Sequence, residues 1–353
     1  MNRPCQWLLL LPLLAAATVA CSPVETDPAP SWALTEESRQ HVTDPELESR
    51  IFAALDAAAE AGTDPSISKY DVRAATVIEH EGLHRAVIGG NTEWAGYPEA
   101  IHGETSLLNH VINLVGPEEA REQVSFLVFY KDGACGTGGS CGDCRDYLMT
   151  TTRWQDLLMV CGSGADHSVH VGRFDRWVVP ETDFREATPE EIGLPEDRLE
   201  ELVATAVDAR AGGVALFTAA EEHLGVAALT TRGNVYRAAG ADDAAFHYRY
   251  PIGAVLQQAA AFGDYFVTAI VVATAPGHTP RISYRDRQYG YEASSFNLKR
   301  GHPPIRLILV EEPDDRSSRR FRHTTFEEAL PGAFSTASFM PEAVDRFLDE
   351  RAP

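Results

Sequence analysis

The chain has 353 residues, of which 52 are Asp or Glu and 30 are Lys or Arg, so its formal net charge is −22. With 44% hydrophobic and 23% charged residues, the composition is that of a folded protein and not of a disordered one. The length predicts about two domains, and the negative charge argues against binding to DNA or RNA polymers, because that binding depends on Lys and Arg.

The first 20 residues predict a secretory signal peptide. A charged start precedes the apolar stretch Trp7–Ala17, which is too short to span a membrane. Cys21 follows, and the residues before it resemble a bacterial lipobox, with Thr18 where Leu is usual. We therefore expect an exported cell-envelope lipoprotein that contacts the membrane only through a lipid on Cys21, with residues 21–43 as a polar tether. The alternative is cleavage by an ordinary signal peptidase, which would release a soluble protein.

An amphipathic helix and a hairpin are predicted next. Residues 44–61 place Leu, Ile and Ala side chains on one helical stripe, and residues 74–78 and 85–88 have the pattern of two strands joined by a turn. His80–His84 in that turn matches the H-E-x-x-H motif of zinc peptidases. The motif requires a helix, so a hairpin would leave both histidines exposed; a peptidase is the less favoured alternative.

A second amphipathic helix is predicted after Ile101. Apolar residues from Leu107 to Val115 recur at helical spacing, which places His102 and Glu104 in the first turn. An imidazole and a carboxylate two residues apart can both face one metal at this helix start. Taken singly, each is also typical of a helix start that carries no ligand.

Four cysteines cluster between residues 135 and 161. Cys141 and Cys144 have the spacing that lets two sulfurs bind one tetrahedral zinc, and they open a predicted helix whose dipole favours thiolates. A C-x-x-C pair alone fits redox chemistry, a disulfide or a metal site. For Cys135 and Cys161 we expect a disulfide, with a four-cysteine structural zinc site as the alternative.

The two helix starts together predict one site, because H-x-E followed by C-x-x-C is the signature of zinc deaminases. His102, Cys141 and Cys144 would bind Zn²⁺ and leave its fourth position for water, as in catalytic zinc sites. Zinc lowers the pKa of that water toward about 7. Glu104 is not a ligand and would transfer the proton.

With these motifs the chain resembles the cytidine deaminase family over most of its length. Residues 68–75 are similar to the family's S-x-F-x-V-G-A-A strand, with Tyr70 in place of Phe, and residues 90–93 to its G-x-N-x-E stretch. Residues 140–146 are similar to P-C-G-x-C-R-Q, with Ser140 and Asp146 as departures. The His-Cys-Cys set and the length resemble the two-repeat bacterial type.

The resemblance implies an α/β fold, a three-layer α/β/α sandwich with a mixed sheet, in two tandem copies. It also implies a zinc-dependent aminohydrolase that converts cytidine or deoxycytidine to the uridine product and ammonia, and that forms a homodimer. Asn91 and Glu93 would hold the ribose hydroxyls of this small nucleoside, and Tyr70 would line the substrate pocket.

A second copy is visible in the sequence, because residues 226–251 repeat the order of motifs in residues 74–98. Counting from the two Tyr-Pro pairs places Val255 and Gln257 at the positions of His102 and Glu104, and no cysteine follows Cys161. We therefore expect a catalytic domain over residues 44–190 and a degenerate, non-catalytic one over residues 191–353, with an acidic linker at residues 180–198.

Two interpretations stay open at this point. The second copy either completes the active pocket or only packs against the first copy. The whole protein is either a deaminase or a nucleoside-binding lipoprotein that has lost activity, and the intact set of His102, Glu104, Cys141 and Cys144 favours the deaminase.

Overall fold

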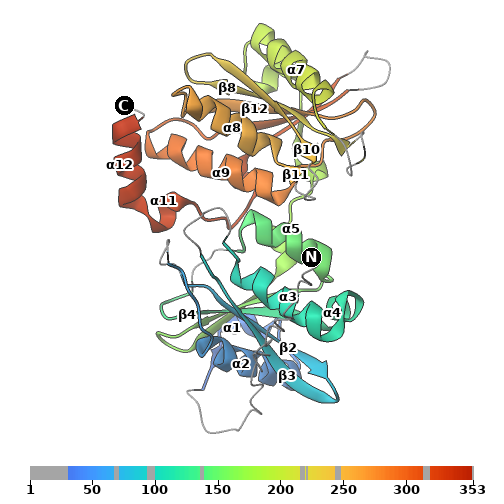
Figure 1. The fold of residues 1–353 in the computed structure, drawn as a ribbon, viewed down its shortest axis with the longest axis vertical. Coiled ribbons are helices and arrows are strands. Elements are labelled where there is room, and N and C mark those ends of the chain that lie inside the picture. Colours follow the sequence, from blue (N-terminus) through green and yellow to red (C-terminus); the bar gives the residue numbers. More distant parts are fainter. Residues whose placement is uncertain are drawn as a thin grey trace, which may run out of the picture.

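The computed structural model describes residues 31–66, 71–93, 100–135, 139–214, 219, 222–242, 248–312 and 319–351. Two six-stranded mixed sheets, each with its own helices, form the lower and upper halves of the molecule in Figure 1. Within the described ranges, no helix is both long and apolar enough to cross a membrane.

The first sheet has the strand order β1-β6-β5-β4-β2-β3. Strands β4 and β5 are parallel, as are β1 and β6, and the other neighbouring pairs are antiparallel. The strands are β1 (Ala33–Leu34), β2 (Arg73–His80), β3 (Leu83–Gly90), β4 (Phe126–Lys131), β5 (Leu158–Ser163) and β6 (Ser168–Arg173).

Helices cover both faces of this sheet, which makes three layers. On one face Ile51 of α2 lies in a buried cluster with Phe126 of the sheet. On the other face Leu107 of α3 lies in a cluster with Leu127. The helices are α1 (Glu36–Arg39), α2 (Pro45–Ala59), α3 (Gly103–Val115), α4 (Pro117–Gln123), α5 (Gly142–Thr151) and the 3-10 turn η1 (Phe174–Trp177).

The segment with the H-E-x-x-H motif is a β-hairpin, as its strand pattern predicts. Strand β2 ends at His80 and β3 begins at Leu83, with Glu81 and Gly82 at positive φ between them. His84 pairs across the hairpin with Glu79. This excludes the helical arrangement that an H-E-x-x-H zinc peptidase requires.

The second sheet repeats the first. Its order is β7-β14-β13-β12-β8-β9, and each pair has the same direction as its counterpart in the first sheet except at the β7 edge, where β7 is antiparallel to β14. The strands are β7 (Arg185–Ala187), β8 (Gly225–Thr230), β9 (Val235–Ala239), β12 (Val267–Ala273), β13 (Arg306–Glu311) and β14 (Arg320–Thr325). A separate small pair is formed by β10 (Ala241–Asp242) and β11 (Tyr248–Arg249).

The helices of the second half also cover both faces of their sheet. Leu202 of α7 packs in a cluster with Val271 on one face, and Ile252 of α8 packs with Val272 on the other. The helices are η2 (Glu181–Asp183), α6 (Pro189–Ile192), α7 (Glu196–Ala211), α8 (Pro251–Ala261), α9 (Tyr284–Lys299), α10 (Phe326–Ala329), α11 (Thr336–Phe339) and α12 (Pro341–Arg351).

The folded units begin earlier than the expected domain boundaries. Residues 31–43, expected to belong to the tether, carry β1 and α1, because the apolar side chains of Trp32 and Leu34 are buried against the first sheet. Likewise the acidic segment expected to be a linker contains β7, which pairs with β14 of the second sheet. Ordered structure therefore begins before residue 44 in the first half and before residue 191 in the second.

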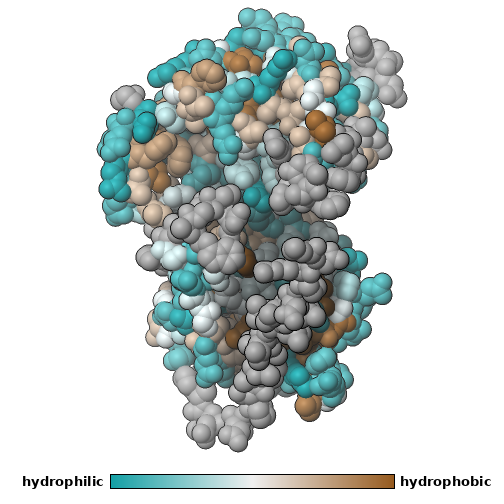
Figure 2. Space-filling model, in the orientation of Figure 1, coloured by the Kyte–Doolittle hydropathy of each residue, from teal (hydrophilic) through white to brown (hydrophobic). Residues whose placement is uncertain are grey.

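The two halves meet where α5 packs against α9, near the middle of the molecule in Figure 1. Hydrophilic residues cover much of the visible outer surface, with hydrophobic residues scattered among them, as Figure 2 shows. The helix α5 of this contact also carries Cys144, with Cys141 at its N-cap, so the junction between the halves adjoins the predicted site.

Candidate metal centre

The four predicted site residues lie at the starts of two helices. His102 is the N-cap of α3 and Glu104 lies in its first turn. Cys141 is the N-cap of α5 and Cys144 lies in its first turn. Helix α3 follows strand β3, and α5 follows β4, which is separated from β3 by β2 alone. The fold thereby brings both helix starts to one place, as the motif spacing predicts.

The side chains converge there. His102 Nδ1 lies 3.1 Å from Cys141 Sγ and 3.2 Å from Cys144 Sγ. The three potential ligand atoms all lie within 4.8 Å of one another, and among the described residues this is the only such group of three or more His, Cys, Asp or Glu side chains.

The donor set fits zinc. Two sulfurs at about 2.3 Å and one imidazole nitrogen at about 2.0–2.1 Å from a zinc ion would be separated by roughly 3–4 Å, which matches the observed nitrogen–sulfur distances. Cys141 and Cys144 form no disulfide with each other or with another described cysteine, whereas Cys135 and Cys161 are joined in one, as expected. Because the sulfurs of Cys135 and Cys161 are bonded to each other, they are unavailable for a four-cysteine zinc site.

Charge is distributed unequally over the three side chains. The hydrogen bond from Cys144 holds the pKa of Cys141 well below its usual value, and the neighbouring His102 acts in the same direction. The hydrogen bond to Cys141 raises the pKa of His102 to about 9. Burial raises the pKa of Cys144 well above its usual value. These shifts favour the thiolate form of Cys141, the protonated form of His102 and the thiol form of Cys144.

Glu104 is a buried carboxyl beside these ligands, with 6% of its surface exposed. Burial raises its pKa, and the negative charge of Cys141 acts in the same direction. The Cys144 side chain forms a hydrogen bond with it and opposes this shift. A carboxyl with a raised pKa next to a metal site is well suited to taking up and releasing a proton.

Backbone hydrogen bonds hold the segment with Asn91 and Glu93 next to the start of α3. Thr92, between them, exchanges two backbone hydrogen bonds of 2.9 Å with Ile101, the residue before His102. Both side chains are buried, and Asn91 Oδ1 accepts a hydrogen bond from the N–H of Val72 at 3.0 Å. Tyr70 and Cys21, the other two predicted site residues, lie outside the described residues.

Two features that sequence reasoning missed hold this site together. A Cβ atom on Gly103 would lie 2.9 Å from the carbonyl oxygen of Val72, so this glycine lets the first turn of α3 lie close to the residue that precedes β2. Arg145, directly after Cys144, is fully buried and donates to the carbonyl of Ser140 at 2.8 Å. Burial lowers the pKa of Arg145 to about 10. The sequence offered one signal, the Gly between His102 and Glu104.

The second half places different residues at its helix starts. Tyr250 is the N-cap of α8 and Ser283 that of α9, so Tyr250 corresponds to His102, and Ser283 and Asp286 to the two cysteines. The prediction that Val255 and Gln257 are the counterparts of His102 and Glu104 is wrong. It assumed that both helices begin at the same distance from their Tyr-Pro pairs, but α8 begins at Pro251 itself, whereas α3 begins five residues after Pro98.

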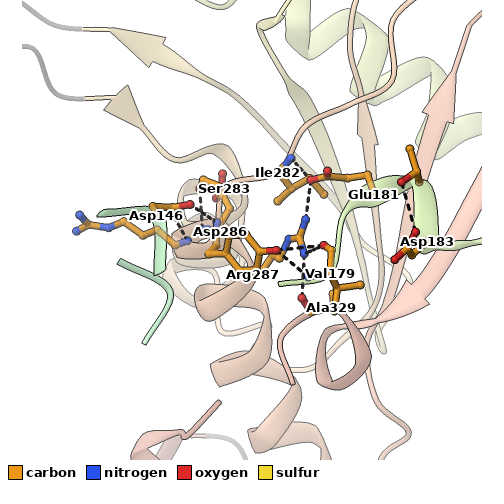
Figure 3. Close-up of polar contacts among 12 residues, drawn as sticks. Asp146, Val179, Glu181, Asp183, Ile282, Ser283, Asp286, Arg287 and Ala329 are labelled. Atoms are coloured by element: carbon orange, nitrogen blue, oxygen red, sulfur yellow. Dashed lines mark hydrogen bonds and ion pairs between the residues drawn. The ribbon is translucent and has the colours of Figure 1, made fainter. Parts of the chain in front are cut away.

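A carboxylate joins the two helix starts of the second half. Asp286 Oδ1 accepts hydrogen bonds from the N–H groups of Ile252 at 2.9 Å and Gly253 at 3.3 Å (Asp286 in Figure 3). Burial raises the pKa of Asp286 to about 7. Its Oδ2 atom is buried and has no hydrogen-bond partner among the described residues.

Comparisons with known proteins find similarity in solved structures alone. Neither protein-family models nor curated protein sequences match the chain. A 1.6 Å structure of cytidine deaminase from Burkholderia pseudomallei is 22% identical with a TM-score of 0.31, covering 38% of this chain and 98% of that chain. Cytidine deaminase from Mycobacterium leprae is 18% identical, with a TM-score of 0.28 and coverage of 38% and 97%. The Mycobacterium tuberculosis enzyme is 18% identical, with a TM-score of 0.27 and coverage of 38% and 96%.

Proposed function

We propose that the chain is a zinc-dependent aminohydrolase that converts a cytosine-type nucleoside, cytidine or deoxycytidine, and water to the uridine product and ammonia. One observation carries this proposal: His102 Nδ1 lies within 3.2 Å of two unpaired cysteine sulfurs, beside the buried carboxyl of Glu104. Imidazole, two thiols and a nearby acid are the groups that hydrolytic deamination at a zinc site needs.

His102, Cys141 and Cys144 would hold the metal. When bound, zinc supplies a Lewis acid that makes water a competent nucleophile near neutral pH. One imidazole and two thiolates neutralise the charge of Zn²⁺, so the site needs no further counter-charge.

Glu104 would transfer the protons. Its carboxylate would accept one proton from the attacking water and deliver it to the ring nitrogen of the base. It would then accept the second proton from the hydroxyl now bonded to the ring carbon and give it to the amino group, which leaves as ammonia while the hydroxyl becomes the carbonyl. The raised pKa of this buried carboxyl supports that role, because the group retains a proton at a higher pH than an exposed glutamate does.

Asn91, Glu93 and Tyr70 would bind the nucleoside. The first two are buried polar residues linked through Thr92 to the start of α3, which suits contacts with ribose hydroxyls. The net charge of −22 argues against a nucleic-acid polymer as the substrate.

We further propose an exported homodimer with a lipid anchor on Cys21, in which the second half is a degenerate copy of the first. The apolar stretch before Cys21 supports export and lipidation. Radiolabelled palmitate that stays on a Cys21→Ser variant would count against the anchor. The shared strand order of the two sheets supports the copy relationship.

The direct test is ammonia release from cytidine, deoxycytidine, cytosine and adenosine, with zinc content measured on the same samples. We expect activity with the first two substrates, and a fall in kcat of about 10²- to 10⁴-fold in Glu104→Gln with zinc retained. Glu292→Gln, which changes a partly buried carboxyl of α9, is the matched control and keeps activity. Wild-type protein that binds zinc but releases no ammonia from any substrate would favour a nucleoside-binding protein without activity.

A further inference from the structure

Helix α5, which begins at the metal centre, and helix α9 of the second half cap each other. The Asp146 carboxylate accepts hydrogen bonds from the N–H groups of Tyr284 at 2.9 Å and Arg285 at 3.0 Å, at the start of α9. In return, Gln288 Oε1 accepts a hydrogen bond from the N–H of Gly142, the first residue of α5, at 3.2 Å. Each acceptor lies five residues after the N-cap of its own helix, so the contact is reciprocal.

Two buried arginines repeat this reciprocity. Arg145 of α5 and Arg287 of α9 each donate hydrogen bonds to two backbone carbonyls (Arg287 in Figure 3). One carbonyl belongs to the same half of the molecule as the arginine, and the other belongs to the opposite half. The carbonyls belong to Trp177 and Pro331 for Arg145, and to Ala329 and Val179 for Arg287. The junction is therefore a built interface and not a chance contact of two domains.

Both residues between the two cysteines are held by the second half. A Cβ atom on Gly142 would lie 2.0 Å from the carbonyl oxygen of Tyr284, so only glycine allows α9 to approach this closely. Asp143 forms an ion pair with Arg285, with an Nη1–Oδ1 distance of 3.0 Å. Every residue of the Cys141–Cys144 turn is thus either a thiol or in contact with α9.

A metal site of this kind depends on the backbone that carries its ligands. The separation of the two sulfurs is set by the torsion angles of Gly142 and Asp143, since both thiols come from one helical turn. Outer contacts that orient metal ligands typically contribute about 10- to 100-fold to metal affinity.

We propose that Gln288 and Arg285 of the second half are positioning residues for the metal centre. They hold the Gly142–Asp143 turn so that both thiols face His102 before a metal binds. The second half thereby acts as an intramolecular support for the site in the first half. This inference rests on the proposed function for the identity of the metal. The experiment that tests it measures metal binding and not deamination.

The test uses the full chain with Gln288→Met, which removes the acceptor oxygen, and Arg285→Gln, which removes the cation. Zinc affinity is measured by competition with a chelator, and the cobalt-substituted protein is examined for its sulfur-to-metal charge-transfer and d–d absorption bands. Arg281→Gln removes the same charge from an exposed side chain four residues before Arg285 and is the matched control. Arg285→Lys restores a cation that can reach Asp143.

We expect zinc affinity about 10- to 100-fold lower and shifted cobalt bands in Gln288→Met and Arg285→Gln. Arg281→Gln should match wild type, and Arg285→Lys should recover most of the affinity. Affinities and cobalt spectra within about twofold of wild type in both variants would overturn the inference. Should Gln288→Met fail to fold, Arg285→Gln decides alone, because this arginine side chain is 33% exposed.

Failure of the two proposals is distinguishable. Wild-type protein that binds zinc without releasing ammonia overturns the proposed function, and the effect of the variants on zinc affinity then still decides the positioning role. Wild-type protein that binds neither zinc nor cobalt overturns both.

Discussion

The proton balance of three side chains decides when the site can bind a metal. Zinc requires a neutral imidazole and two thiolates. Of the three groups, Cys141 alone has a pKa shifted toward the form that zinc needs. The pKa values of the other two are shifted the other way: the hydrogen bond to Cys141 raises that of His102, and burial together with the Cys141 contact raises that of Cys144. Zinc must therefore displace protons from the site.

We predict that zinc affinity rises with pH across the neutral range. Below its raised pKa of about 9, His102 is mostly protonated, so each increase of one pH unit removes competing protons and raises affinity about tenfold or more. The measurement is chelator competition from about pH 6.5 to 8.5, corrected for protonation of the chelator. An affinity that stays constant over this range would contradict the charge distribution described above.

The convergence of four side chains at the candidate site was predictable from the sequence, and the contacts from the second half were not. His102, Glu104, Cys141 and Cys144 stand at spacings that match the chemistry and lie at predicted helix starts. Gln288 contacts Gly142 across 146 residues, and no local pattern indicates which residue will cap a distant helix. Such supports depend on tertiary packing, which a single sequence does not reveal.

At the scale of elements, the two halves join equivalent helix starts by different chemistry. In the first half an imidazole and two thiols meet between α3 and α5. In the second half the Asp286 carboxylate spans directly from α9 to the N–H groups that begin α8. A carboxylate at the start of a helix is stabilised by the helix dipole, so the Asp286 side chain links the two helix starts of the second half.

We predict that Asp286→Ala lowers the free energy of unfolding by about 1–3 kcal/mol, because two helix N–H groups lose their acceptor. Asp286→Asn keeps an acceptor oxygen and should cost less. Since burial raises the pKa of Asp286 to about 7, the folded protein binds more protons here than the unfolded chain between about pH 4 and 7. The contribution of this residue is therefore greatest in acid and declines as pH rises toward 7.

Urea unfolding at about pH 5 and pH 8 checks both parts of this prediction. Wild type should lose more stability over that interval than Asp286→Asn, which has no carboxyl to ionise. Equal stability of wild type and Asp286→Ala at the lower pH would show that the carboxylate does not join the two helices.

The elements themselves were largely predictable. The amphipathic stripe of residues 44–61 is helix α2, and the two alternating runs around Gly82 are the hairpin β2–β3. The start of α8 in the second half was misplaced by five residues, because Tyr250-Pro251 marks the start of this helix, whereas Tyr97-Pro98 lies ahead of the start of α3. Sequence motifs fix the order of elements more reliably than the length of the loops between them.

At the scale of the whole molecule, two sheets with the same strand order meet at one pair of helices. The sequence predicted two α/β units with helices on both faces of mixed sheets. It placed their boundaries too late, because Trp32 and β7 look like parts of polar, Pro-containing connections. That Trp32 packs against the first sheet and that β7 pairs with β14 becomes apparent only when the edges of the two sheets are known.

The most direct test of this account is zinc K-edge X-ray absorption of the purified, full-length protein. We predict two sulfur neighbours and one imidazole nitrogen, completed by a light atom; Cys141→Ser should leave at most one sulfur neighbour, and Cys161→Ser should keep both. A metal surrounded by four sulfurs, or by nitrogen and oxygen alone, would contradict the assignment of His102, Cys141 and Cys144 as its ligands.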